Sequence, residues 1–389
     1  MIVIGGDAIV DLIDRGQRLF EACPGGSTLN CALASGQLGS DVLYVSTLSR
    51  DAYGDLLFDR LQECHVTLRA DARSDAYSSL AVVSLDETNQ PSYAFYRDGT
   101  ADREIPVDAV IASFPPQMSI FHVGSCALIP SDDQDAWLQI VLAAQERGAL
   151  ISIDPNCRPS MTTDPDRYRK GIARFLQVAD LVKLSDEDLE YLHPEWTDQA
   201  LSRFIETYSP QLCVYTRGSE GLTGFTGGGV RVSVEASLPG PLSDTVGAGD
   251  SVHGTLLSEI DRLGLSGRAL SELTVETLKE VLTLASQVAG VNCTRAGCQP
   301  PTREEVATLF GSRRAASSKA LMASSASEDL KNSVAIGSGS AKVAKPREAK
   351  SNSWSTDRRL ATNSSVSTAI SCIRSNISSA LSTASLSRA

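Results

Sequence analysis

Residues 1–310 alternate short β-branched runs with longer amphipathic segments, and this alternation constrains the fold more than any other feature of the sequence. The runs expected to form strands are 2–4, 42–46, 79–85, 119–123, 150–153, 181–184, 212–215 and 230–234. The segments expected to form helices are 28–38, 54–63, 132–147, 168–177, 185–192, 198–208, 248–262 and 274–292. This order predicts an α/β fold in which helices cover both faces of a mostly parallel sheet.

One segment departs from the alternation. Residues 77–97 contain two extended runs, 79–85 and 92–96, which are joined by the polar turn 86–90. This pattern predicts a β-hairpin of the kind that covers a neighbouring site as a flap. Ligands of parallel sheets bind beyond the carboxyl ends of the strands, so residues that directly follow a strand are the first candidates for function.

The last 79 residues differ from the rest in composition. They carry a net charge of +8 against −20 for residues 1–310, and they contain 22 Ser, 14 Ala and one aromatic residue, Trp354. Such a segment lacks the large apolar side chains that could offset the entropy of ordering. We therefore expect one domain over 1–310 and a disordered basic tail over 311–389. Composition favours an extension without function over an interaction tail but leaves the second open.

Charge and apolar patterning argue against several classes of protein. The formal net charge of −12 disfavours a nucleic-acid partner, and no run approaches the ~18 apolar residues of a membrane span. The chain enters apparent structure at Met1 without a secretion signal, and its nine cysteines include no C-x-x-C pair. We expect a soluble cytoplasmic protein with reduced thiols, no membrane partner, and a homodimer left open.

The segment Asp244-Thr245-Val246-Gly247-Ala248-Gly249-Asp250 precedes a helical pattern. Two glycines at the mouth of a helix let the backbone approach an anion, and the free N–H groups at the positive helix end face it. An acid would repel a bound phosphate, but it can take a proton from an attacking hydroxyl while the loop amides hold the transferring phosphoryl group. Taken alone, the loop leaves open whether Asp250 is a base or a helix cap.

A second glycine turn, Gly25-Gly26-Ser27-Thr28-Leu29-Asn30, also enters a predicted helix. Paired glycines let a ligand approach the backbone, and Asn30 can both donate and accept hydrogen bonds. Asp11, at the end of the first strand region, offers a carboxylate acceptor. These groups suit neighbouring hydroxyls, although each segment taken singly is more often an ordinary helix start or turn acid.

Six motifs in chain order make the pattern specific. They are Gly25-Gly26…Asn30, Tyr96-Arg97-Asp98-Gly99-Thr100-Ala101-Asp102, Asp154-Pro155-Asn156-Cys157-Arg158-Pro159, Val182-Lys183-Leu184-Ser185-Asp186-Glu187-Asp188-Leu189, Thr216-Arg217-Gly218 and Asp244 to Asp250. With them the chain resembles the ribokinase-like, pfkB-type sugar kinases, and within these the bacterial-type fructokinases, over residues 1 to about 310. The resemblance implies a three-layer sandwich with a mostly parallel central sheet and a small β lid formed by the hairpin.

The resemblance also implies ATP-dependent phosphorylation of a sugar hydroxyl, with D-fructose converted to fructose 6-phosphate as the best match. It implies that Asp250 is the catalytic base and that the backbone of Val246, Gly247, Ala248 and Gly249 is the anion hole. The implied sugar contacts are Asp11, Gly25, Gly26, Asn30 and Arg97. The implied ATP contacts are Lys183, Thr216 and Gly218, with Asn156 and Arg158 beside the phosphates and Asn292 near the adenine.

Metal ions enter only through the resemblance. Magnesium is implied as the partner of ATP, but the family motif Asn-x-x-Glu falls on Ser185-x-x-Asp188, where both residues differ. Asp188 can still act through water, because Mg²⁺ retains several waters, and a first-turn helix acid that favours the macrodipole explains it equally well. Some relatives bind a monovalent cation such as K⁺, and Asp244 with the backbone of Val246 and Gly297 occupies the corresponding places.

Four other functions compete with this interpretation. The same base and anion hole could serve a 2-keto-3-deoxygluconate kinase or a nucleoside kinase, and Arg97 could pair with a substrate carboxylate, with the ATP phosphates or with Asp102. A catalytically silent sugar sensor is the alternative outside enzymes. A dinucleotide-binding dehydrogenase is disfavoured because no G-x-G-x-x-G follows the first strand, and Gly227-Gly228-Gly229 leads into a predicted strand.

Overall fold

The computed structural model describes residues 1–311 except 86–90, 130–131, 197–198 and 266. The central sheet contains β1 (Ile2–Ile4), β4 (Val42–Tyr44), β6 (Val66–Leu68), β10 (Ile120–Gly124), β11 (Leu150–Asp154), β12 (Leu181–Ser185), β13 (Leu212–Thr216), β14 (Leu222–Thr226) and β15 (Arg231–Val234). The helices are α1 (Ser27–Gln37), α2 (Ala52–Glu63), α3 (Val107–Ala112), α4 (Asp132–Glu146), α5 (Pro165–Leu176), α6 (Asp186–Leu192), α7 (Ala200–Tyr208), α8 (Ala248–Arg262) and α9 (Val275–Asn292), with a last helix over 303–311.

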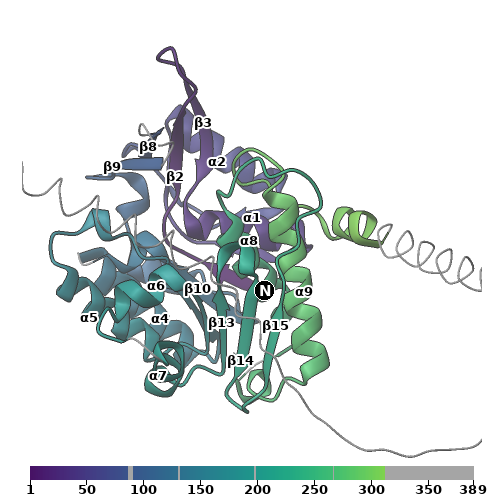
Figure 1. The fold of residues 1–389 in the computed structure, drawn as a ribbon. Coiled ribbons are helices and arrows are strands. Elements are labelled where there is room, and N and C mark those ends of the chain that lie inside the picture. The colour runs from purple at the N-terminus through teal and green to yellow at the C-terminus, as the bar shows by residue number, and fades with distance from the viewer. Residues whose placement is uncertain (86–90, 130–131, 197–198, 266, 312–389) are drawn as a thin grey trace, which may run out of the picture. The chain divides into compact units, whose positions relative to one another are not determined.

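The central sheet has nine strands in the order β15-β14-β13-β12-β11-β10-β1-β4-β6. The pairs from β13 to β6 are parallel, whereas β14 pairs antiparallel with β13 and with β15. Along each strand, alternate side chains enter opposite layers. Ile2 and Ile4 belong to the core cluster that includes residues of α1, α2, α8 and α9, whereas Val3 belongs to the cluster that includes residues of α3 to α7. Figure 1 shows these helices on the two faces of the sheet, which confirms the predicted three-layer α/β arrangement.

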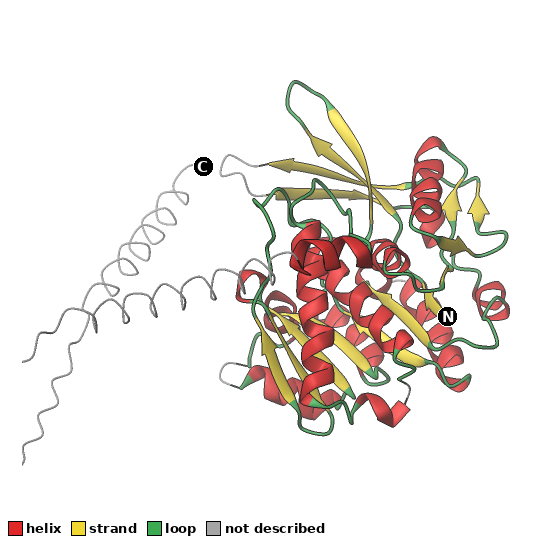
Figure 2. Cartoon of the chain, turned by 90° about the vertical axis from the view of Figure 1, so that its right-hand side faces the viewer, coloured by secondary structure: helices red, strands yellow, loops and turns green. Residues whose placement is uncertain are grey.

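A second sheet stands apart from the central one, with the strand order β3-β2-β8-β9. It contains β2 (Ile9–Asp14), β3 (Phe20–Gly25), β8 (Ser79–Leu85) and β9 (Pro91–Tyr96), and we call it the lid sheet. β8 and β9 pair antiparallel, which confirms the hairpin, while its turn at 86–90 lies outside the described residues. The predicted lid lacked two strands, β2 and β3. β2 pairs with β8 in parallel and with β3 in antiparallel orientation. Figure 2 shows this sheet projecting from the edge of the molecule.

Four strands outside the lid were also missed, namely β6, β14 and the short parallel pair formed by β5 (Leu48–Ser49) and β7 (Arg73–Ser74). Gly224 interrupts the β-branched pattern of β14, and a Cβ atom there would lie 3.0 Å from Leu282 Cδ1 of α9. Glycine therefore serves close packing between the strand and the helix. The predicted tail of residues 311–389 falls, apart from Gly311, outside the described residues.

The chain runs from β1 through β4 to β6 on one side, and then from β10 onward on the other. The neighbours β1 and β10 therefore form a switch point in the parallel sheet, where a ligand crevice is expected at the carboxyl ends. Asp7 follows β1, Ser125 follows β10, and Asn156 follows β11 at this edge. Of these three residues, Asn156 was among the predicted candidates.

Candidate active site

The amino end of α8 begins at the glycine turn that the sequence singles out. Gly247 adopts a φ of +71°, and a Cβ atom there would lie 2.5 Å from Cys298 Sγ. A Cβ atom at Gly249 would meet only Lys183, with Nζ at 3.2 Å. No side chain caps α8 among the described residues, and the Gly249 and Asp250 amides have no hydrogen-bond acceptor there. This helix end is therefore open to an anion, as its macrodipole favours.

Asp250 lies in the first turn of α8 with only 7% of its surface exposed. Ser27 Oγ donates to Asp250 Oδ1 over 2.7 Å, and Asn30 Nδ2 donates to Asp250 Oδ2 over 2.9 Å. Asn156 Nδ2 lies 3.3 Å from Asp250 Oδ1. Burial raises the pKa of Asp250, while the hydrogen bonds from Asn30 and Ser27 oppose the shift. The side chain of Asp250 therefore does not cap its own helix. Its carboxylate accepts hydrogen bonds from α1 and from Asn156, and these fix its orientation.

The amino end of α1 is built differently. Gly26 has a φ of +101°, and a Cβ atom there would lie 2.5 Å from the Asp7 carbonyl oxygen. The buried carboxylate of Asp7 accepts hydrogen bonds from the amides of Ser27 (3.1 Å) and Thr28 (3.3 Å). Asp7 therefore caps α1 from a loop twenty residues earlier, and this end of the helix is closed by a protein carboxylate.

Asp11 and Gly25 are diagonal neighbours in the β2–β3 pair, in which Asp11 pairs with Cys23 and Gly25 with Ile9. A Cβ atom at Gly25 would clash with Asp11 Oδ2, so glycine leaves the room that this carboxylate occupies. Burial, together with the nearby carboxylates of Asp7, Asp250 and Asp244, raises the pKa of Asp11 to about 7, although Arg158 acts in the opposite direction. Asp11 belongs to a lid strand, β2, and not to the end of the first strand as the sequence suggested.

Asn156 and Arg158 follow β11 and contact each other. Asn156 has a φ of +37°, a left-handed conformation that is uncommon outside glycine and that concentrates at functional sites. Arg158 Nη1 donates to Asn156 Oδ1 over 2.6 Å, and Asn156 Nδ2 donates to Ser27 Oγ over 2.7 Å. The motif after β11 is therefore linked to the Asp250 carboxylate through Ser27.

Lys183 is buried beneath the glycine turn of α8. Its ammonium group donates to Asp154 Oδ2 over 2.9 Å, and the two side chains are 4% and 0% exposed. Burial alone would lower the pKa of Lys183, but Asp154, Asp188 and Asp250 raise it above its usual value, so it stays charged. The structure places this cation against Gly249 rather than in an open cleft.

Asp188 forms a reciprocal capping box with Ser185 at the start of α6. Ser185 N and Oγ donate to Asp188 Oδ2 over 3.1 and 2.7 Å, and Asp188 N donates to Ser185 Oγ over 3.0 Å. Asp188 Oδ1 accepts from Cys157 N over 2.7 Å. Both carboxylate oxygens of Asp188 accept hydrogen bonds from protein groups, as expected for an acid at the start of a helix. A role in binding Mg²⁺ through water stays a prediction.

Asp244 joins the glycine turn to the segment after α9. Its oxygens accept from Val246 N over 2.9 Å and Gly297 N over 3.0 Å, so the three predicted positions do lie together. Asn292 is fully buried, donates to the Val246 carbonyl and accepts from Gln299 N. Asn292 therefore supports the turn with both ends of its amide, rather than presenting a free polar group to a nucleotide.

The remaining predicted ATP contacts, Thr216 and Gly218, lie at or just after the carboxyl end of β13 of the central sheet. Thr216 ends β13 and is half-buried, and Gly218 begins the following 3₁₀ turn with a φ of +49° and is exposed. Both follow a strand carboxyl end, where a ligand of a parallel sheet is expected.

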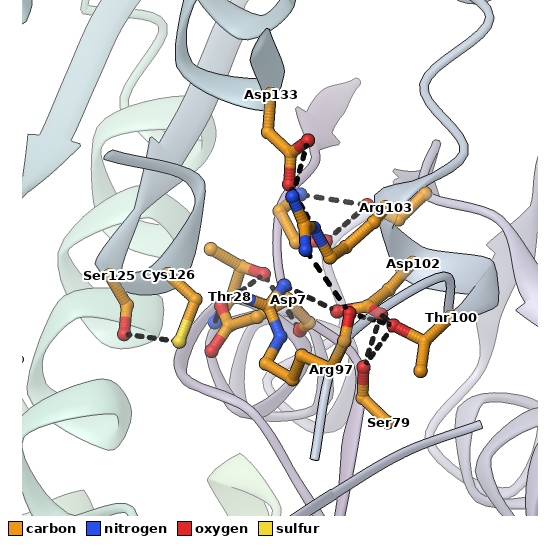
Figure 3. Close-up of polar contacts among 12 residues, drawn as sticks. Asp7, Thr28, Ser79, Arg97, Thr100, Asp102, Arg103, Ser125, Cys126 and Asp133 are labelled. Carbon is orange, nitrogen blue, oxygen red and sulfur yellow. Dashed lines mark hydrogen bonds and ion pairs between the residues drawn. The ribbon is translucent and has the colours of Figure 1, made fainter. Parts of the chain in front are cut away.

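Arg97 extends from the end of β9 toward Asp102, as Figure 3 shows. Arg97 Nη2 donates to Asp102 Oδ2 over 2.7 Å, and the two side chains are 9% and 1% exposed. Asp102 also accepts from Thr100 Oγ1 over 2.9 Å and from Ser79 Oγ. Arg97 lines a pocket of about 910 Å³ between the lid sheet and residues 126–161. Its charge is balanced by Asp102, one of the three partners considered from the sequence.

Three residues of this site escaped sequence reasoning. Ser27 donates to Asp250, Asp7 caps α1, and Asp154 pairs with Lys183. Ser27 and Asp154 stood inside motifs that were noticed, whereas Asp7 gave no signal beyond its neighbouring glycines. Within the described residues, no group of three or more His, Cys, Asp or Glu side chains is placed to hold a metal ion.

Known proteins match this arrangement over most of the chain. The family model described as pfkB family carbohydrate kinase matches residues 2–305. The chain belongs to the pfkB family of carbohydrate kinases. It is a phosphotransferase that acts on an alcohol group, with a ribokinase-like α/β fold.

Individual pfkB relatives share this extent. A fructokinase of Rhizobium leguminosarum bv. trifolii is 31% identical, over 72% of this chain and 86% of that protein. The crystal structure of a fructokinase with bound ATP from Xylella fastidiosa is 28% identical, with a TM-score of 0.73, and covers 80% of this chain and 98% of that one. A Vibrio cholerae fructokinase double mutant, in its fructose, ADP and potassium ion bound form, is 25% identical with a TM-score of 0.68, over 79% and 97% of the two chains.

Two further expectations can be compared with the structure. Eight of the nine cysteines lie in the described part of the chain, and none of these eight is in a disulfide there. In the same part, no helix combines the length and apolar character that crossing a membrane requires.

Proposed function

We propose that this pfkB kinase phosphorylates D-fructose to fructose 6-phosphate with ATP. The observation that carries the proposal is the position of Asp250, a buried carboxylate directly beside the uncapped amino end of α8. The fructokinase relatives support fructose as the acceptor. A base and an anion-binding helix end in contact are what phosphoryl transfer to a hydroxyl requires.

In the proposed reaction, Asp250 takes the proton of the sugar hydroxyl as the oxygen forms its bond to the γ-phosphorus. The bond between that phosphorus and the bridging oxygen of ATP breaks, and ADP leaves. The free amides of Gly249 and Asp250, at the positive end of α8, would stabilise the charge on the transferring group. The Lys183 ammonium beneath Gly249 adds positive charge at the same point.

The sugar would bind between α1 and the lid sheet. Asn30 donates to Asp250, but its buried Oδ1 has no hydrogen-bond partner among the described residues. An orphaned buried acceptor beside the base suits a sugar hydroxyl, because leaving it unpaired costs ~1–3 kcal/mol. Asp11 would accept a second hydroxyl, and the Gly25-Gly26 backbone lets the ligand approach closely. Arg97 would line the lid side with its charge held by Asp102, which weakens the case for a ketoacid substrate.

ATP would lie along the carboxyl ends of β12 and β13, near Thr216 and Gly218, with Asn156 and Arg158 beside the phosphates. Mg²⁺, when bound, would neutralise phosphate charge. The carboxylate of Asp188 is occupied by protein donors, so it would contact the ion only through water. A K⁺ ion beside Asp244 and the Val246 and Gly297 backbone is proposed on their proximity and on the potassium-bound relative.

The test is kcat/KM for fructose, ribose, 2-keto-3-deoxygluconate and adenosine at saturating Mg·ATP. Fructose should rank first, because a sugar that leaves a buried polar partner unpaired can lose up to ~10⁴-fold. A higher value for the ketoacid would mean that Arg97 leaves Asp102 for the substrate. A higher value for adenosine would overturn the sugar assignment, and no turnover with any acceptor would favour a sensor.

A further inference from the structure

The hydroxyl of Ser27 lies between the motif after β11 and the carboxylate on α8. Asn156 Nδ2 lies 2.7 Å from Ser27 Oγ, and Ser27 Oγ lies 2.7 Å from Asp250 Oδ1. Ser27 is the first residue of α1 and is 223 positions from Asp250 in the chain. Ser27 is only 4% exposed, so bulk water has little access to these hydrogen bonds.

Arg158, Asn156, Ser27 and Asp250 form a series of hydrogen bonds, and the direction of each follows from which atoms can donate. Arg158 can only donate, so the atom of Asn156 that faces it must be the carbonyl Oδ1, at 2.6 Å. The other end of that amide is then the donor Nδ2, and Ser27 Oγ must accept from it. The single proton of Ser27 is left for Asp250 Oδ1. The hydrogen bonds therefore run from the Arg158 guanidinium to the Asp250 carboxylate.

We propose that Ser27 is a positioning residue for phosphoryl transfer, which holds Asp250 Oδ1 and thereby presents Oδ2 to the hydroxyl of the sugar. Oδ1 receives two donors, Ser27 Oγ and Asn156 Nδ2, which occupy both of its lone pairs. Oδ2 receives one, from Asn30 Nδ2, and keeps a lone pair for the incoming proton. This inference rests on the proposed function, because it assigns the oxygen that acts as base.

The backbone around Ser27 keeps the hydroxyl in place. Ser27 N donates to Asp7 Oδ2, and the left-handed φ of Asn156 aims its amide at Ser27. Farther along α1, Ser35 Oγ donates to the Cys31 and Gly254 carbonyls, which ties α1 to α8 without touching Asp250. Ser35 is thus a matched control, an equally buried serine at the same helix interface.

Several charged and titratable groups face Asp250 from the surrounding elements. Lys183 of β12 and Arg158 after β11 lower its pKa. The carboxylates of Asp11 and Asp154 lie near it, as do the thiols of Cys31 and Cys298. Ser27→Ala changes none of these groups. It removes one donor to the carboxylate, so the pKa of Asp250 should rise further, and the acidic limb of the kcat profile should move to higher pH.

The experiment compares kcat, both KM values and the pH profile of kcat in Ser27→Ala, Ser27→Thr, Ser35→Ala and Asp250→Asn. Ser27→Ala should lower kcat about 10-fold to 100-fold, as expected for a hydrogen bond to a charged group. Its KM values for fructose and ATP should stay within about threefold, and its acidic limb should shift upward. Ser27→Thr, which restores the hydroxyl, should recover most of kcat. If threonine lowers the melting temperature, Ser27→Cys keeps the volume and a weak donor.

Three results would overturn the inference. One is Ser27→Ala with kcat within about twofold of the parent and an unmoved acidic limb, which is below the effect of losing such a hydrogen bond. Another is an equal loss in Ser35→Ala, which would trace the effect to packing between α1 and α8. The third is no recovery in either hydroxyl or thiol variant that folds. Asp250→Asn separates the two claims, because parent-like activity there would refute the base itself, whatever Ser27 does.

Discussion

The amino ends of α1 and α8 both begin at a glycine with positive φ, and they meet at Asp250, yet they are prepared for different partners. The first amides of α1 are hydrogen-bonded to the Asp7 carboxylate. Those of Gly249 and Asp250 in α8 have no acceptor within the described residues. A helix end that already holds a carboxylate has no free donors for a second anion, whereas an open one attracts it. We therefore assign neutral sugar hydroxyls to the α1 side and phosphate to the α8 side.

The largest expected effect is that of Asp250→Asn, which leaves both helix ends intact and removes only the base between them. The asparagine oxygen can accept from Ser27 and Asn156, and its amide nitrogen can donate to the unpartnered Asn30 Oδ1 once the Asn30 amide turns over, so melting temperature and fructose KM should change little. General-base catalysis is commonly worth ~10²–10⁴-fold, and kcat should fall by that much. Steady-state assays across a range of enzyme concentrations check this. A kcat within about threefold of the parent would lie far below that range and exclude Asp250 as the base.

A smaller effect distinguishes the two glycine turns directly. At Gly249 a methyl group would meet only Lys183, with Nζ at 3.2 Å, and the backbone there has no positive φ, so a shift of a few tenths of an ångström should let Gly249→Ala fold. The methyl would enter the open end of α8, and kcat should fall about tenfold or more, as expected when a stabilising contact worth ~1.4 kcal/mol is lost.

Gly26→Ala is the matched control for that variant. Its Cβ would lie 2.5 Å from the Asp7 carbonyl at a φ of +101°, so the cost should appear in folding. Its melting temperature should drop by several degrees, corresponding to ~1 kcal/mol or more of strain. Calorimetry and kinetics on both variants test the contrast. The contrast between the two helix ends would be wrong if Gly249→Ala is less stable than Gly26→Ala, or if Gly249→Ala keeps the kcat of the parent.

The elements around these two helix ends show which features of the fold could be predicted from the sequence. The residue pattern of α8 predicted its bounds correctly, because an apolar stripe of period 3.6 is a local signal. The lid strands β2 and β3 were missed, since β3 contains Pro24 and ends in Gly25, and its place in the sheet depends on pairing with β2. Periodicity reports the local chain but not a partner strand whose pairing stabilises it.

In the candidate site, too, residues in local motifs could be predicted, whereas contacts between distant segments could not. Asp250 and Asn30 could be named as candidates because they stand in glycine turns that enter predicted helices, and Asp11 because it is a carboxylate at the end of the first strand region. That α1 is capped by Asp7 while α8 is open could not be predicted, because no local pattern says which carboxylate folds against which helix. Asn292 and Lys183 were expected to face ATP, but they are buried with protein partners, which only the packed structure reveals.

The fructose KM should depend on pH through Asp11, which lies on the side of the site proposed to bind the sugar. Burial raises the pKa of Asp11 to about 7, so its carboxylate is protonated below that pH and accepts hydroxyls less well. Fructose KM should therefore be lowest above pH 7 and rise as the pH falls through 7. Asp11→Asn should raise KM by about tenfold, the worth of one hydrogen bond to a charged group, and flatten this dependence. A KM that improves at acid pH would contradict the role of Asp11.

The smallest effect is expected from ending the chain at Ser312. Each residue proposed for the two helix ends precedes that point, and residues 311–389 contain no Phe or Tyr. The shortened chain should keep its kcat and melting temperature, because the removed segment adds little apolar surface to a core. Parallel kinetics and thermal unfolding of the full and shortened chains provide the check, and a marked loss in either would show that the tail contributes to the domain.

The contrast between the helix ends is tested most directly by amide NMR of the complex with fructose, ADP, Mg²⁺ and aluminium fluoride, which mimics the transferring phosphoryl group. The amide protons of Gly249 and Asp250 have no acceptor among the described residues, so they should shift downfield as they bind the anion. Those of Ser27 and Thr28, which already bond to Asp7, should move much less. The reverse pattern, with the α1 amides shifting and the α8 amides unchanged, would contradict the account.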